Sequence, residues 1–170
     1  MRGKLLKGKV HKLGDNINTD YIISGRYKFK TLDNVELAKH LLEDIHPNFY
    51  QKVSPGDFIV AGENFGCGSS REQAPLAIKY AGIGAVLAKS FARLFYRNAI
   101  NVGLPIIISN TDRIKENDTI LVDLAKGNIS IPEQGINLSI EPFPPEILKI
   151  IEAGGLVEYF KKYGGWPLSL

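Results

Sequence analysis

The sequence predicts an α/β fold with mostly parallel central strands and flanking helices, and three observations lead to that prediction. Between residues 57 and 108, apolar runs of strand length alternate with segments of helical spacing. The order strand–helix–strand–helix–strand is typical of parallel strands joined by right-handed crossovers. Farther on, two strand-like runs enclose Ala125-Lys126-Gly127, which indicates a hairpin. We expect residues 1–170 to form one domain.

The individual elements follow from local patterns. Apolar and β-branched runs predict strands over 5–13, 57–61, 84–88, 104–108, 119–124 and 128–131. Helical spacing predicts helices over 37–42, 70–81, 90–100, 144–154 and 156–162. Pro144-Pro145 can open the fourth of these helices and Gly154-Gly155 can end it.

Composition narrows the function classes. The chain has 170 residues, of which 44% are apolar and 23% charged, an ordinary globular composition. A net charge of +3 without a Lys/Arg block argues against nucleic-acid binding. No apolar run is long enough to span a membrane and no signal peptide is visible, so we expect no membrane partner and a cytoplasmic location. One cysteine excludes an intramolecular disulfide and any multi-cysteine metal site built by this chain alone.

The segment from Gly62 to Gln73 is the strongest functional signal. It contains three glycines, one cysteine, two adjacent serines and an arginine, and it lies between a predicted strand and a predicted helix. Either serine can cap the helix, Ser70 with Gln73 or Ser69 with Glu72. Unpaired N–H groups at such a turn favour an anion, and an arginine adds a two-pronged donor. The segment therefore predicts a carboxylate site with a spare hydroxyl.

Other interpretations of this segment remain open at this stage. It matches neither a P-loop nor a complete dinucleotide fingerprint, and a tight turn with an ordinary cap is a simple alternative. A serine-hydrolase triad is disfavoured because the G-x-S-x-G pattern is missing. A serine that acts as a base needs nearby N–H donors and positive charge, which the loop and Arg71 can supply. We interpret Cys67 as a small apolar residue.

Two further segments carry candidate residues. Over 90–101, Ser90 is expected to cap a helix whose buried face holds Phe91, Leu94 and Phe95, with the arginines at 93 and 97 in structural or subunit contacts. Residues 15–20 are rich in turn formers, and Asp20 is a candidate site residue there.

Taken together, these motifs resemble a known family. Asn18-Thr19-Asp20-Tyr21-Ile22-Ile23 is followed by Gly66-Cys67-Gly68-Ser69-Ser70-Arg71-Glu72, by Lys89-Ser90-Phe91-Ala92-Arg93 and by Arg97-Asn98-Ala99-Ile100-Asn101-Val102-Gly103-Leu104-Pro105. In this order they resemble the small subunits of 3-isopropylmalate dehydratase and its homoaconitase-type relatives, which correspond to the swivelling domain of aconitase. The resemblance covers nearly the whole chain and implies a swivelling β/β/α domain.

The resemblance implies a hydro-lyase that moves a hydroxyl between neighbouring carbons of a di- or tricarboxylate by dehydration and rehydration. It implies a separate large subunit that carries a [4Fe–4S] cluster, with no metal held by this chain. Carried over by motif, Ser69 is the base that takes a proton α to a carboxylate. Ser70 and Arg71 then bind the substrate carboxylate.

Substrate choice in this family is attributed to a short segment that here reads Ser24-Gly25-Arg26-Tyr27-Lys28-Phe29-Lys30-Thr31. It matches neither Tyr-Leu-Val-Tyr, common in isopropylmalate enzymes, nor Tyr-Leu-Arg-Thr of homoaconitase types. Phe29 favours an alkyl substituent, as in isopropylmalate of leucine biosynthesis, whereas Lys28 and Lys30 suit an extra carboxylate, as in homoaconitate or citrate. We expect Arg26 and these three residues to contact the substrate. A non-catalytic anion-binding module is the alternative function, and a homo-oligomer of the isolated chain stays open.

Overall fold

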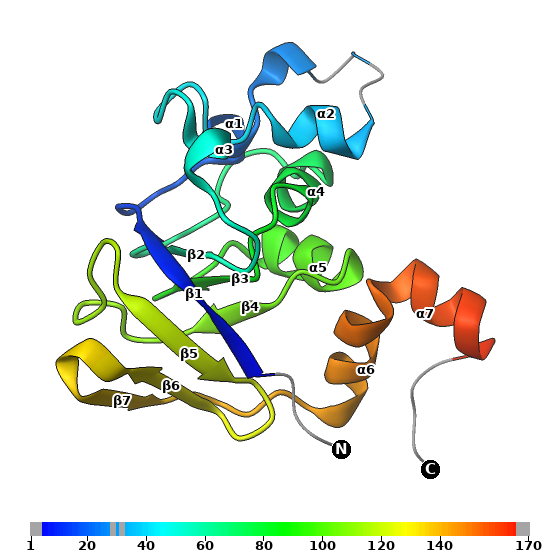
Figure 1. Ribbon diagram of the computed structural model, residues 1–170. Coiled ribbons are helices and arrows are strands. Elements are labelled where there is room, and N and C mark those ends of the chain that lie inside the picture. The colour runs from blue at the N-terminus through cyan, green and yellow to red at the C-terminus, as the bar shows by residue number, and fades with distance from the viewer. Residues whose placement is uncertain (1–4, 28–29, 31–32, 166–170) are drawn as a thin grey trace.

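The computed structural model describes residues 5–27, 30 and 33–165. Within them, a seven-stranded sheet has the order β4-β3-β2-β1-β5-β6-β7 (Figure 1). The strands are β1 Leu5–Lys12, β2 Phe58–Val60, β3 Ala85–Ala88, β4 Ile106–Ile108, β5 Thr119–Asp123, β6 Asn128–Ile131 and β7 Ile136–Ser139. The pairs among β1 to β4 are parallel, and β5, β6 and β7 add antiparallel strands beside β1. The predicted α/β class with parallel central strands is confirmed.

Helices precede, connect and follow these strands. They are α1 Thr19–Ile22, α2 Asn34–Ala38, α3 Phe49–Lys52, α4 Gln73–Tyr80, α5 Arg93–Asn101, α6 Pro145–Ala153 and α7 Leu156–Tyr163, with the 3₁₀ turns η1 Gly25–Tyr27 and η2 Pro132–Gln134. The parallel pairs β2–β3 and β3–β4 are joined through α4 and α5, as the sequence pattern predicted. Gly154 ends α6 in the left-handed conformation at φ +94°, which a glycine adopts without steric cost.

The central strands are buried on both faces, which explains why they are continuously apolar. Successive side chains of a strand point to opposite faces. Ile59 and Ala61 pack into one core with the helices, whereas Phe58 and Val60 pack into a second core with residues of β5 to β7. Figure 1 shows the helices α4 and α5 on one side of β2 to β4 and the antiparallel strands curled over the other side. The molecule thus has a β/β/α layering.

Several elements differ from the sequence prediction: the short helices α1 and α3 were not predicted, and α2 and β7 differ for physical reasons. The helix expected over 37–42 lies at 34–38, because the side chain of Asp33 accepts a hydrogen bond from the Glu36 backbone at 2.7 Å and begins the helix earlier. The backbone of Leu42, at φ +55°, is incompatible with a helix at the expected end. Strand β7 was not predicted, although Ile136-Asn137-Leu138-Ser139 alternates apolar and polar residues as a half-buried edge strand does.

The parallel pairing of β1 with β2 positions the candidate site. Their register places Lys12 opposite Val60, so the segments that follow the two strands leave the sheet at the same edge. The carboxyl ends of parallel strands are where α/β folds place ligand sites. The turn-rich segment after β1 and the glycine-rich loop after β2 therefore meet there.

Candidate active site

The glycine-rich loop runs from the end of β2 to α4, and it takes a path that two of its glycines require. Gly66 has φ +78°, and a Cβ there would lie 2.2 Å from a ring carbon of Phe95. Gly68 has φ +91°, and its Cβ would lie 2.5 Å from Asn18 Oδ1. Both positions combine a left-handed backbone with close approach, so a side chain at either would displace the loop.

The turn after β1 is joined to this loop by backbone and side-chain hydrogen bonds. The Gly66 N–H donates to the Ile17 carbonyl at 2.8 Å, and the Thr19 N–H donates to the Cys67 carbonyl at 2.8 Å. The Thr19 hydroxyl, 1% exposed, donates to the Ser69 carbonyl at 2.8 Å. Asn18 begins α1 by accepting from the Asp20 N–H at 2.9 Å. The two segments that the sequence singled out separately therefore form one structure.

Asp20 and Arg71 face each other across this junction. Nη1 of Arg71 lies 2.5 Å from the Asp20 carboxylate and donates to the Ile23 carbonyl at 3.3 Å. The Arg71 side chain is 15% exposed, whereas that of Asp20 is 50% exposed. Nε of Arg71 is buried, and no acceptor for it lies in the described part of the chain. The guanidinium is thus held in place by α1 and its C-terminal turn while part of its donor set stays unused.

The two serines present their hydroxyls differently. Both residues are exposed. The Ser70 hydroxyl accepts from the Asn98 amide of α5 at 3.2 Å. The Ser69 hydroxyl has no hydrogen-bond partner among the residues that the structure describes, whereas the Ser69 backbone carbonyl accepts from Thr19. This arrangement offers one free hydroxyl beside an arginine.

The expected helix caps are wrong. Helix α4 begins at Gln73 with Glu72 at the cap position and without a side-chain cap, so neither Ser69 nor Ser70 forms a capping box. Thr19 and Asn98 hold the two serines in the loop before the helix begins. Ser90 does not cap α5 either, because its hydroxyl accepts from the Asn64 N–H and donates to Glu63.

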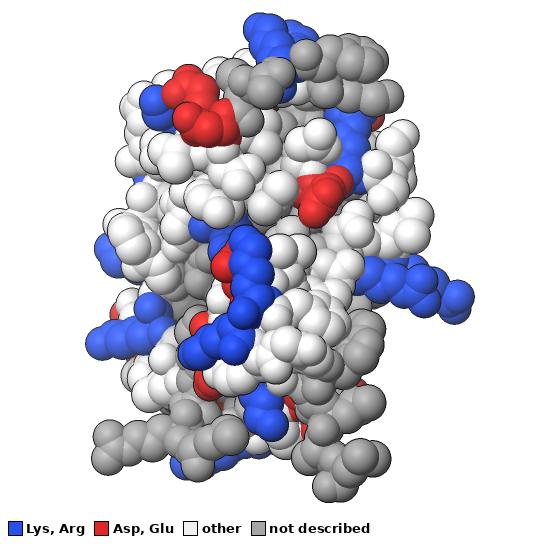
Figure 2. Space-filling view, turned by 90° about the vertical axis from the view of Figure 1, so that its right-hand side faces the viewer, with Lys and Arg blue, Asp and Glu red and all other residues white. Residues whose placement is uncertain are grey.

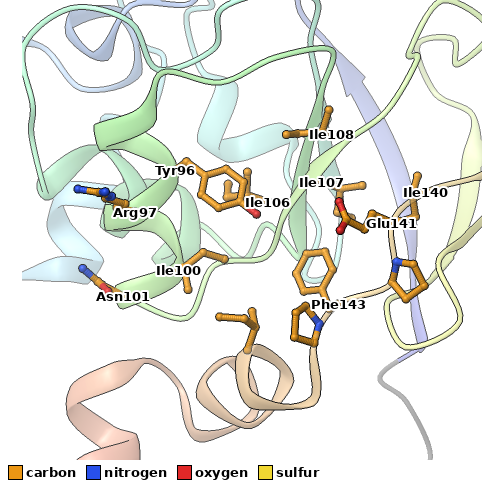
Figure 3. Close-up of a pocket in the computed structure, with 13 residues that line it drawn as sticks. Tyr96, Arg97, Ile100, Asn101, Ile106, Ile107, Ile108, Ile140, Glu141 and Phe143 are labelled. Carbon is orange, nitrogen blue, oxygen red and sulfur yellow. The ribbon is translucent and has the colours of Figure 1, made fainter. Parts of the chain in front are cut away.

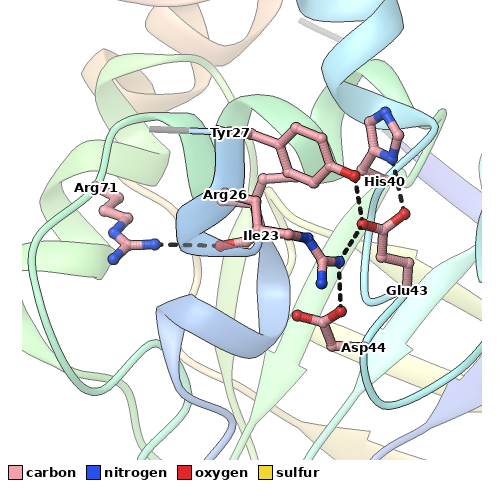
Figure 4. Close-up of polar contacts among 7 residues, drawn as sticks. All are labelled: Ile23, Arg26, Tyr27, His40, Glu43, Asp44 and Arg71. Atoms are coloured by element: carbon pink, nitrogen blue, oxygen red, sulfur yellow. Dashed lines mark hydrogen bonds and ion pairs between the residues drawn. The ribbon is translucent and has the colours of Figure 1, made fainter. Parts of the chain in front are cut away.

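The substrate segment predicted at 24–31 is only partly described. Lys28, Phe29 and Thr31 lie outside the described residues. Arg26 pairs with Glu43 at 2.9 Å and with Asp44 at 2.7 Å, and its side chain is 60% exposed (Figure 4). Lys30 is exposed, with Nζ 5.4 Å from the centre of the Tyr27 ring. The structure thus brings Asp20, Ser69, Ser70 and Arg71 together and places Arg26 in a separate ionic cluster.

Several known proteins are similar to this chain in sequence and in fold. A model of the aconitase C-terminal domain matches residues 43–111. A 3-isopropylmalate dehydratase small subunit of Archaeoglobus fulgidus is 56% identical, covering 92% of this chain and 95% of that protein. This chain belongs to the family of 3-isopropylmalate dehydratase small subunits. The family prediction made from the motifs is confirmed.

Other members of this dehydratase small-subunit family support the same assignment. A methanogen homoaconitase small subunit of Methanocaldococcus jannaschii is 56% identical over 93% of this chain and 92% of its own length. The crystal structure of a 3-isopropylmalate dehydratase from the same species has a TM-score of 0.89 at 55% identity and covers 95% of this chain and 96% of that one. The fold and the role as a dehydratase small subunit are therefore shared across the family.

Asn98 is a residue that sequence reasoning did not assign to the site of this small subunit. The motif Arg97-Asn98-Ala99 was noted, but only contact across the fold reveals that the amide reaches Ser70. Leu94, expected in the buried face of its helix, is 54% exposed, and that part of the prediction is wrong. It precedes Asn98 by one helical turn, so it lies on the face of α5 that adjoins the serine loop. Phe95 is buried and packs edge-on against Phe65.

The described part of the small subunit has no group of three His, Cys, Asp or Glu side chains that could hold a metal ion. Cys67 is a free, partly exposed cysteine. Figure 2 shows basic side chains interspersed with acidic and uncharged ones on the face that carries the C-terminal helices. No helix in the described ranges is long and apolar enough to cross a membrane.

A pocket of about 440 Å³ lies away from the serine loop, between α5, β4 and residues 140–144 (Figure 3). Its walls are mainly isoleucine, proline and phenylalanine side chains, with Tyr96 and Glu141 among the polar ones. None of the site residues predicted for this chain lines the pocket. We therefore place the candidate active site at the serine loop, where chemically useful groups converge, and not in this apolar pocket.

Proposed function

We propose that this chain is the small subunit of a dehydratase that converts 2-isopropylmalate to 3-isopropylmalate in leucine biosynthesis. One observation carries the proposal: a free Ser69 hydroxyl and a positioned Arg71 guanidinium lie in one loop at the carboxyl edge of the parallel strands. The names of the relatives support the same reaction. The working location of such an enzyme is the cytoplasm.

Arg71 binds a substrate carboxylate. Its planar fork can donate two parallel hydrogen bonds to two oxygens, and Asp20 orients it from one side. The Asp20 side chain is 50% exposed, so the Asp20–Arg71 ion pair lies where a substrate carboxylate can approach from solvent. Ser70 adds a hydroxyl donor, since its oxygen already accepts from Asn98. The same groups stabilise charge that develops on the carboxylate when its α-proton leaves.

Ser69 takes that α-proton. A serine hydroxyl is a very weak acid, so the alkoxide form requires positive charge and N–H donors nearby. Arg71 supplies the charge, and the loop supplies the backbone amides. Ser69 is an exposed residue, so a substrate held by a second subunit can approach it.

The [4Fe–4S] cluster that this reaction implies does not fit the residues of this chain. Such clusters are held by three or four thiolates, and the chain has one cysteine. We assign the cluster to a large subunit, where it would supply a Lewis acid. The division into small and large subunits agrees with the names of the relatives.

A second substrate, homoaconitate, is the other candidate because one relative is named a homoaconitase small subunit. Lys30, which is exposed beside Tyr27, could pair with its additional carboxylate. Most of the relatives carry the isopropylmalate name, and Phe29 suits an alkyl group, so isopropylmalate is preferred. Arg26, Lys28, Phe29 and Lys30 remain predicted substrate contacts.

Co-expression with a large-subunit partner of this family, followed by cluster reconstitution, tests the proposal. The complex is assayed with isopropylmalate, homoaconitate, citrate and citramalate. The expected result is the highest kcat/KM for isopropylmalate, with no turnover by either subunit alone. A complex that is assembled and cluster-loaded but inactive on all four acids would refute the dehydratase assignment.

A further inference from the structure

We propose that Glu43 is a positioning residue for substrate binding, which holds Tyr27 and the residues before it against Arg71. This inference rests on the proposed function, because it concerns how that site is shaped. Glu43 lies outside the serine loop and outside the predicted substrate segment, in the turn that follows α2.

Three side chains converge on the Glu43 carboxylate (Figure 4). Oε1 accepts from the Tyr27 hydroxyl at 2.6 Å and from Nη2 of Arg26 at 2.9 Å. Oε2 lies 2.7 Å from Nδ1 of His40. Both oxygens of the carboxylate are therefore used, and two of the three partners belong to η1.

The Tyr27 ring is held on its faces as well as at its hydroxyl. It stacks on the His40 imidazole with ring centres 4.1 Å apart. The cations of Arg26 and Lys30 lie 5.8 and 5.4 Å from its centre. A hydroxyl bound to a carboxylate and a ring sandwiched in this way leave the side chain little rotational freedom.

The electrostatics agree with a firmly held carboxylate. Burial alone would raise the pKa of Glu43, but the hydrogen bonds from Tyr27, His40 and Arg26 outweigh it and lower the pKa below its usual value. The hydrogen bond to Glu43, together with burial, raises the pKa of Tyr27. Glu43 is thus ionised and Tyr27 protonated at neutral pH, as the contact requires.

Tyr27 and Arg71 border the same small cavity. It is also lined by Ile23, Ser24, Leu37 and Gln73. A Cβ on Gly25 would lie 3.7 Å from Nη2 of Arg71, so the backbone of η1 passes directly beside the guanidinium. The position of Tyr27 consequently sets the space next to the group that binds the carboxylate.

Release of Tyr27 is therefore expected to weaken substrate binding and to leave the chemical step almost unchanged. Ser69 is held by Thr19 and Ser70 by Asn98, and neither contact involves Glu43. An interaction that shapes the ground-state site without touching the reacting atoms changes KM with kcat maintained. A purely structural role would instead lower the amount of active complex and leave KM constant.

The test uses the reconstituted complex of both subunits with isopropylmalate as the probe. The variants are Tyr27→Phe, which keeps the ring stack but removes the hydroxyl, Glu43→Ala, and the double variant. Glu36→Ala is the matched control, because among the described residues the Glu36 carboxylate pairs only with Lys39, at the exposed surface. Each single variant is expected to raise KM about five- to tenfold with kcat within about twofold of wild type. The KM of the double variant should equal that of Glu43→Ala, because both single changes remove the same hydrogen bond between Tyr27 and Glu43.

The outcomes separate this inference from the proposed function. An active wild-type complex with unchanged KM in Tyr27→Phe overturns the positioning role alone. So does a fall in kcat at constant KM, or a double variant whose effect on KM is the product of the two single effects. A wild-type complex that turns over none of the four acids overturns the proposed function, and this inference with it.

Discussion

The hydroxyl of Thr19 donates a hydrogen bond to the backbone carbonyl of Ser69 at 2.8 Å, and this contact joins the turn after β1 to the loop that carries the proposed base. Thr19 is 1% exposed, so the bond is shielded from water. The adjacent residue Asp20 pairs with Arg71, which lies two positions after Ser69. One short helix thus fixes the backbone of the base and the direction of the anion-binding side chain.

Replacing Thr19 with valine is expected to reduce kcat about tenfold or more while destabilising the chain by about 1 kcal/mol. Valine keeps the shape but leaves the Ser69 carbonyl without its donor. Thr111→Val is the control, because Thr111 is equally buried and donates to the Ala61 carbonyl at 2.7 Å, outside this junction. Thermal unfolding and steady-state kinetics on both variants distinguish the roles. Equal losses of kcat in the two variants would mean that Thr19 contributes stability alone.

Ser69→Ala is expected to lower kcat by ~10²–10⁴-fold, the range typical of a general base. Assembly with the large subunit and KM should change little, because the loop is held through the Ser69 carbonyl and not through its hydroxyl. Ser139→Ala, at an exposed serine of β7, is the matched control. Turnover of Ser69→Ala close to the wild-type rate in a cluster-loaded complex would remove Ser69 from the role of base.

Arg71→Lys is expected to raise KM and lower kcat together. Lysine retains the charge but lacks the planar fork that pairs with two carboxylate oxygens at once. It also cannot keep both the Asp20 and the Ile23 contacts and still reach the substrate with two donors. Arg113→Lys, at an exposed arginine after β4, controls for the general effect of the exchange. If Arg71→Lys is fully active in the kinetic assay, Arg71 serves packing only.

The parts of the fold that follow from local patterns were predictable. The crossover strands, the hairpin and the last two helices appear near their predicted positions because burial on both sheet faces produces continuous apolar runs, and glycine and proline mark the ends. Strand β7 shows a pattern that could have been recognised. The start of helix α2 is set by the Asp33 cap, and the apolar spacing over 37–42 alone therefore placed the helix too late.

The candidate site was predictable in its residue types but not in its contacts. The sequence could single out Ser69, Ser70, Arg71 and Asp20 from motifs. It could not predict that a threonine hydroxyl would replace helix capping as the constraint on Ser69, because that bond joins distant parts of the chain. For the same reason, the cluster that ties Arg26 to Glu43 had no local signature.

Asp57 gives a pH-dependent prediction for stability. Its carboxylate accepts from the backbone N–H groups of Ser54 at 2.9 Å and Lys9 at 3.0 Å, and His11 Nε2 lies 2.8 Å away. Burial raises the pKa of Asp57, but these three contacts outweigh it, so the pKa lies below its usual 3.8. Because the folded pKa is lower than the unfolded one, ionised Asp57 stabilises the fold above about pH 4, and that contribution disappears as the pH falls through the folded pKa.

Asp57→Asn should therefore lower the free energy of unfolding by about 1–3 kcal/mol at neutral pH, and the difference from wild type should shrink below about pH 4. Asp112→Asn is the matched control: its carboxylate is 64% exposed and pairs with Lys89, so the expected loss is within about 1 kcal/mol. Urea unfolding followed by circular dichroism over a pH series measures both differences. A gap between wild type and Asp57→Asn that stays constant down to about pH 2 would show that the variant acts through packing and not through the charge of Asp57.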